Sequence, residues 1–162
     1  MSFGRVGRTV ASMAVTIPGV TGAYAALDAV GSAFEIPSAI GAEGAVVSQL
    51  LVIDRASGMS GLRFHFYNQV PPVIADNAPW TLPSGQENAW LGSIDVASTD
   101  WVTAGITGGN TAMKAEIVNK NIGLYNNSGN NRSVWCQVQA LNAMTFGGLN
   151  SAQTVRLVSL QD

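Results

Sequence analysis

Two strongly apolar runs lie close together in the chain, AVVSQLLVID (Ala45–Asp54) and LRFHFYN (Leu62–Asn68), separated only by the loop RASGMSG. In the second run the apolar residues Leu62, Phe64 and Phe66 alternate with more polar ones. A period of two is the period of a β-strand, because successive side chains point to opposite faces. A Gly- and Ser-rich loop of this length is typical of a hairpin. The pattern therefore predicts that the two runs pair with each other.

A proline-containing segment, PPVIADNAPW, follows the second run. Pro71 and Pro72 cannot continue a central strand because proline has no backbone N–H to donate. Asp76 or Asn77 can cap a single helical turn that leads to Trp80. We interpret this segment as one that leaves the sheet to meet a neighbouring subunit. The candidate interface residues are Pro71, Pro72, Asn77 and Trp80.

The remainder of the chain repeats short strand-like segments at fairly regular spacing, with glycine-rich turns between them. Eight to ten strands are expected, and no long amphipathic helix is apparent. This pattern is typical of an all-β protein, here an antiparallel β-sandwich or a jelly-roll-like domain. We expect one domain over residues 23–162. The clearest further strands are predicted at Trp90–Val96, Thr111–Asn119, Ser133–Leu141 and Thr154–Leu160.

The N-terminal residues 1–22 are predicted to form an extended arm. The first 27 residues contain the bases Arg5 and Arg8 and no acid. A terminal segment without hydrophobic periodicity is ordered only when a partner holds it, and the alternative is a solvated tail. Arg5, Arg8 and Val10 are the candidate partner contacts. A resemblance to a secretory signal is weakened by the short, Thr- and Ser-rich apolar part, which ends at Pro18.

Composition limits the functions that need a strong electrostatic field or a membrane. Charged residues make up 11% of the 162 residues, against about 25% in typical soluble proteins. A surface with so few charges suits contact with other subunits. The net charge of −2 gives no general basic field for nucleic acid. We expect no membrane span either, since no uninterrupted apolar stretch reaches about 18 residues.

Candidate catalytic and metal-binding groups are few. His65 is the only histidine and Cys136 the only cysteine, and no G-x-S-x-G motif accompanies the serines. We interpret His65 as structural, and we predict no catalytic residue, no metal and no cofactor. Calcium stays a weaker alternative, because aspartates that are distant in sequence can meet in space. Those aspartates are Asp54, Asp76, Asp95 and Asp100.

The tryptophans leave two interpretations open. Exposed tryptophans could form a sugar-stacking platform, as in a carbohydrate- or receptor-binding module of a phage or a bacterium. More often such residues fill a core or a subunit interface. An enzyme would further require a cleft that places His65 beside an acid. The four tryptophans are Trp80, Trp90, Trp101 and Trp135.

Several motifs, taken in order, resemble a family of small structural proteins of tailed bacteriophages, the capsid decoration or cement proteins. These motifs are YAALDAVG (Tyr24–Gly31), LLVID (Leu50–Asp54), LRFHFYN leading to DNAPW (Asp76–Trp80), WLGSIDVASTDW (Trp90–Trp101) and VRLVSLQD (Val155–Asp162). The loops NNSGNN and MTFGGLN resemble nothing in that family. The resemblance implies a β-sandwich or jelly-roll domain on the outside of the phage head, commonly as a homotrimer.

The same resemblance implies a partner and a location. The partner would be the major capsid protein, and the protein would be a virion component on the capsid surface, assembled in the host cytoplasm. Under this hypothesis the arm contacts the major capsid protein and the body trimerises. The assembly would clamp adjacent capsomers against the pressure of packaged DNA.

Overall fold

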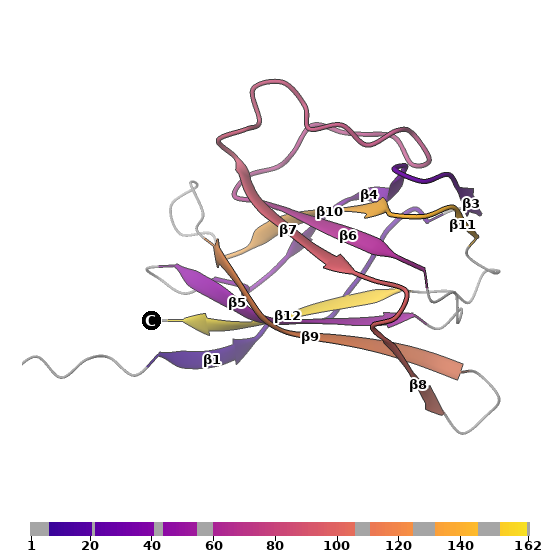
Figure 1. The fold of residues 1–162 in the computed structure, drawn as a ribbon. Helices are drawn as coiled ribbons and strands as arrows, with labels where there is room; N and C mark the ends of the chain where they lie inside the picture. Colours follow the sequence, from indigo (N-terminus) through magenta and orange to yellow (C-terminus); the bar gives the residue numbers. More distant parts are fainter. Residues whose placement is uncertain are drawn as a thin grey trace, which may run out of the picture.

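The computed structural model is an antiparallel all-β sandwich of two main sheets (Figure 1). The large sheet has the order β1-β12-β5-β9-β8, with the short strand β2 also paired to β12. Its strands are β1 (Arg8–Ala11), β2 (Val15–Thr16), β5 (Ala45–Asp54), β8 (Trp101–Gly105), β9 (Thr111–Leu124) and β12 (Thr154–Gln161). The structure describes residues 7–20, 22–40, 44–54, 60–105, 111–124, 132–145 and 153–161, with the backbone alone at 103–105, 111–114 and 117–121.

The small sheet has the order β4-β10-β6-β7, and a third, two-stranded sheet pairs β11 with β3. These strands are β3 (Ala23–Tyr24), β4 (Ala29–Ile36), β6 (Leu62–Tyr67), β7 (Trp90–Val96), β10 (Val134–Ala140) and β11 (Met144–Thr145). The predicted all-β sandwich is thus confirmed, while the jelly-roll connectivity stays a prediction.

The core lies between the two main sheets and is built from the inward-facing residues of each. From the large sheet come Leu50, Val52 and Leu157, all fully buried. Phe64 and Phe66 face them from the small sheet. The inward residues alternate along each strand with residues on the outer face, as the period of two requires.

The predicted hairpin between the two apolar runs is wrong. Strand β5 pairs with β12 and β9 in the large sheet, whereas β6 pairs with β10 and β7 in the small one. The chain therefore crosses from one sheet to the other between Asp54 and Leu62. Each run is a central strand whose apolar residues face those of the other run across the core. A short loop fits a hairpin and a sheet-to-sheet crossing equally well, so its length did not distinguish them.

Residues 69–89, here called the covering segment, run over the outer face of the small sheet (Figure 1). The segment contains turns and an isolated bridge but no helix, so the predicted helical turn after Asp76 is wrong. Its backbone returns to the sheet where Asn68 N–H donates to Ala89 O at 2.9 Å. Because of this cover, β6 is buried on both faces, except for the half-buried Arg63.

The described part of the predicted N-terminal arm joins the large sheet. Strand β1 pairs with β12 from Arg8 to Ala11, and Ile17 is buried in the core. The division of the chain at residue 22 stays a prediction. Among the residues that the structure describes, no helix is long and apolar enough to cross a membrane.

Candidate functional site

A cluster of polar and aromatic side chains lies between the small sheet and the covering segment. At its centre His65, on β6, is 2% exposed. Its imidazole stacks on the indole of Trp80, with ring centroids 3.7 Å apart and planes inclined by 9°. Its Nε2 lies 3.2 Å from Oε1 of Gln139 on the neighbouring strand β10. Trp80 therefore fastens the covering segment directly to the sheet.

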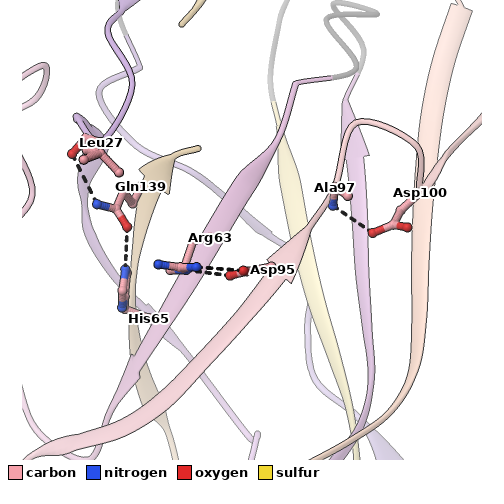
Figure 2. Close-up of polar contacts among 7 residues, drawn as sticks. All are labelled: Leu27, Arg63, His65, Asp95, Ala97, Asp100 and Gln139. Carbon is pink, nitrogen blue, oxygen red and sulfur yellow. Dashed lines mark hydrogen bonds and ion pairs between the residues drawn. The ribbon is translucent and has the colours of Figure 1, made fainter. Parts of the chain in front are cut away.

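A chain of hydrogen bonds extends this contact to a third segment (Figure 2). Nε2 of Gln139 donates to the carbonyl of Leu27 at 3.3 Å, so its Oε1 faces His65 and accepts the imidazole N–H. The same Leu27 carbonyl accepts from the backbone N–H of Trp80 at 2.8 Å. Leu27 has a φ of 74°, in the left-handed region that is strained for leucine. These bonds hold it there.

The turn Asp76–Trp80 is anchored by its side chains as well as by its backbone. Asp76 Oδ1 accepts from the hydroxyl of Tyr24 at 2.7 Å and from the N–H of Gly31 at 2.6 Å. A carboxylate that accepts such bonds makes stronger contacts than a neutral acceptor. The turn is therefore fixed to both β3 and β4.

Asn77 supplies the sharp bend of this turn. Its φ of 62° lies in the left-handed region, which asparagine tolerates better than most residues. Its N–H donates to Ala29 O at 2.9 Å. In the amide orientation that satisfies both neighbours, its side chain donates to Asp28 Oδ2 at 3.0 Å and to Ala23 O at 3.1 Å. Asn77 therefore binds its own chain on three sides.

An ion pair borders the cluster on its exposed side (Figure 2). Arg63 Nε and Nη2 donate to the two carboxylate oxygens of Asp95, at 2.6 and 2.8 Å. Both side chains are more than one third exposed, so solvent screens much of their attraction. The hydrogen bond to Asp95 raises the pKa of Arg63. The pair links β6 to β7 and leaves neither charge uncompensated.

Burial shifts the pKa values of three groups in and around the cluster. It lowers the pKa of His65 to about 4, so the imidazole is neutral at physiological pH. Burial also raises the pKa of Tyr67 and of the Cys136 thiol. Both groups therefore stay protonated, and Cys136 is not a reactive thiolate. The hydrogen bonds and the stacking contact of this cluster dock the covering segment onto the small sheet.

The four aspartates weighed for calcium have separate roles. Asp76 anchors its turn and Asp95 pairs with Arg63, while Asp100 Oδ2 accepts from Ala97 N–H at 2.7 Å in the turn before β8 (Figure 2). Asp54 is 1% exposed at the end of β5. Within the described part of the chain, no group of three or more histidine, cysteine, aspartate or glutamate side chains is placed to hold a metal ion.

The candidate interface residues fall into two groups. Pro71 is buried, and Trp80 is half-buried with its ring on His65. Pro72 and Asn77 are exposed. The first pair therefore packs against the chain's own sheet. A subunit contact through the second pair stays a prediction.

Two of the three candidate arm contacts, Arg8 and Val10, lie on the strand at the edge of the large sheet. On β1, Arg8 is exposed and Val10 half-buried, while Arg5 lies outside the residues that the structure describes. Their role in binding a partner stays a prediction.

Sequence reasoning missed Gln139 and Leu27, which link the cluster together. One signal was present: Gln137 and Gln139 interrupt an otherwise apolar strand, and both are buried. Buried glutamines in a strand indicate that another layer covers that face. Comparisons of the chain with protein-family models, with curated proteins and with solved structures found no match.

Proposed function

We propose that this protein is a non-enzymatic structural component of a tailed-bacteriophage head, which decorates the outside of the capsid and stabilises contacts between capsomers. One observation carries the proposal. The chain covers the outer face of its small sheet with its own residues 69–89, whereas the outer face of its large sheet exposes apolar side chains. An exposed apolar sheet face in a chain with few charges suits a protein that works by contact with other proteins.

The order of the sequence motifs supports the particular class of structural protein. DNAPW, one of the motifs that resemble the decoration proteins, forms the anchored turn that fastens the covering segment. The motif thus coincides with a structural anchor of the fold. The resemblance further implies a homotrimer and the major capsid protein as partner. It also implies a location on the virion surface after assembly in the host cytoplasm.

The N-terminal segment supports a contact with the capsid. Strand β1 stands at the end of the strand order, so one of its edges is open to strand addition by a partner. Arg8 on this strand is exposed. The residues before it add Arg5 and no acid. A basic segment at an open strand edge suits an acidic capsid surface.

The tryptophans favour this function over a carbohydrate-binding module. Trp101 is 7% exposed, and its indole N–H donates to Ser60 O at 3.0 Å. Trp80 stacks on His65, and Trp135 is half-buried. Of the four, only Trp90 exposes more than one third of its surface. One exposed tryptophan does not make the platform of several aromatic rings that sugar stacking uses.

Deletion of the N-terminal residues tests the proposal. A variant that lacks residues 1–7 keeps β1 but loses Arg5. It should bind expanded phage heads much more weakly than the full chain in co-sedimentation, with an unchanged number of copies per particle in solution. Replacement of residues 1–7 by a Gly/Ser segment of equal length is the matched control and should also fail to bind. Unchanged occupancy of the heads by both variants would contradict the proposal.

A further inference from the structure

We propose that the outer face of the large sheet binds a second copy of this chain, with a two-fold axis running along the central strand β5. The inference does not depend on the phage function proposed above. It rests on the arrangement of apolar and charged side chains across three neighbouring strands. The apolar part of this face is made by Val46, Leu51, Ile53, Val158 and Leu160.

The face is apolar and open. Leu160 is 47% exposed and Val46, its partner in the register of β12 and β5, is 38% exposed. Leu51, Ile53 and Val158 are half-buried beside them. In Figure 1 the lower side of the large sheet faces away from the rest of the chain. Exposed apolar side chains that gather on one sheet face and are bordered by polar ones are typical of a protein–protein contact.

Two oppositely charged side chains that the structure describes on this face, Arg156 and Glu116, are placed for a self-complementary contact. Leu51 on β5 pairs with Arg156 on β12 to one side and with Glu116 on β9 to the other. Both charged side chains are exposed. A two-fold axis that runs parallel to β5 in the plane of contact places β12 of one copy opposite β9 of the other. Arg156 of each copy then lies opposite Glu116 of the other, in the same row, and the contact contains two such pairs.

The steric pattern of a second row agrees with the same axis. Val46 on β5 is flanked by Leu160 on β12 and by Gly123 on β9. A side chain at Gly123 would meet no atom within 4 Å, so the surface above it is open. The two-fold axis places the exposed Leu160 of one copy over Gly123 of the other. The charged pair beside Leu51 and the leucine–glycine pair beside Val46 are therefore both complementary about the central strand β5.

The direction of the axis follows from the positions of the charges. An axis that runs across the strands would place Arg156 opposite strand β12 of the second copy, and β12 contains no acidic residue. An axis along β5 also stacks the two sheets with their strands nearly aligned, which is a common packing of β-sheets. The central position of β5, with two strands on each side, lets the whole face take part.

Existing contacts hold both charged groups in place. The Nε of Arg156 donates to Ser12 O at 3.0 Å, which fixes the guanidinium over the β1 side of the face. Gln49 Nε2 donates to Glu116 Oε1. Arginine has five N–H donors, and only the Nε donor of Arg156 is used in the bond to Ser12. Preorganised charges lower the entropic cost of association.

Charge reversal gives a test with an outcome specific to this geometry. In the variants Arg156→Glu and Glu116→Arg, each symmetric contact would bring together two like-charge pairs. Each variant alone should therefore associate at least about tenfold more weakly than the wild type, and its particles should contain half as many copies. An equimolar mixture of the two variants should recover the wild-type copy number. In the mixed pair the two substituted side chains meet each other with opposite charges, and so do the two native ones.

The measurement is light scattering coupled to size-exclusion chromatography, with circular dichroism to establish that each variant folds. Glu87→Arg, an exposed reversal on the covering segment, is the matched control and should leave the copy number unchanged. If either reversal leaves the wild-type copy number unaltered, or the mixture fails to recover it, the proposal is wrong. A reversal that weakens binding to phage heads without changing the copy number would assign this face to the capsid protein and would equally overturn it.

Discussion

Asp76 is one of the residues that fix the covering segment to the body of the protein. Replacement by alanine removes the acceptor for Tyr24 and for Gly31, and each bond to a charged group contributes about 1.5–3 kcal/mol. Asp76→Ala should therefore lower the free energy of unfolding by about 3–6 kcal/mol in urea titrations. Asp100→Ala, which removes one exposed bond, should cost about 1 kcal/mol or less. Similar losses in the two variants would contradict this role of Asp76.

His65 should make stability depend on pH in a defined window. Burial lowers its pKa to about 4, with a smaller lowering by Arg63, while Gln139 and Asp95 oppose the shift. In the unfolded chain the pKa is about 6.5. Between these values the unfolded chain binds more protons. The free energy of unfolding therefore falls as the pH is lowered from about 6.5 to about 4, by about 3 kcal/mol in total.

The variant His65→Phe isolates this contribution. Phenylalanine can stack on Trp80 but does not titrate, so the variant should lose the part of the pH dependence that comes from His65. Urea unfolding of the wild type and the variant at several values between pH 4 and pH 7 measures the difference in the pH dependence of their free energies of unfolding. Carboxylates that titrate near pH 4 affect both proteins alike. Parallel pH profiles for the two proteins would show that His65 does not titrate as its burial predicts.

At the scale of elements, the bend of β4 depends on Gly31. The register of β4 against β10 shifts between Val30 and Phe34, and Gly31 lies in this irregular part with a φ of 66°. A Cβ there would meet Pro18 O at 2.3 Å. The backbone of the N-terminal segment therefore passes too close to β4 for any side chain.

Gly31→Ala combines this clash with left-handed strain and should cost about 3 kcal/mol or more. Gly85→Ala is the matched control, because Gly85 has a φ of 82° but no atom within 4 Å of its would-be Cβ. It should cost about 1 kcal/mol. Thermal or urea unfolding measures both variants. Equal losses of unfolding free energy in the two variants would mean that the close approach of Pro18 does not destabilise Gly31→Ala.

The sequence predicted the strands better than their partners. Alternation located β6, β7, β10 and β12 because that period depends on neighbours along the chain. Pairing depends on residues far apart, as in β12, which lies between β1 and β5. The hairpin prediction failed for this reason. The interpretation of His65 as a structural residue stays a prediction. Its link through Gln139 to Leu27 joins positions 112 residues apart, which no local pattern reveals.

At the scale of the whole molecule, the two outer faces of the sandwich differ. The outer face of the small sheet is closed by the covering segment. His65 lies beneath this segment, stacked on Trp80, and the ion pair of Arg63 with Asp95 lies beside it. The outer face of the large sheet exposes apolar residues around a self-complementary pair of charges. The buried polar groups therefore hold the molecule's own chain, and we propose that the open face binds another chain. This asymmetry is the basis for proposing an architectural role.

Image reconstruction of DNA-filled phage heads, assembled with and without this protein, tests the proposed function most directly. Heads assembled with the protein should show added density on the outer surface that fits the two-sheet sandwich, with the N-terminal end directed at the major capsid protein. Heads assembled without it should lack that density and should release DNA at lower temperature. Identical reconstructions with and without the protein, with the chain found only outside the particle fraction, would contradict the account.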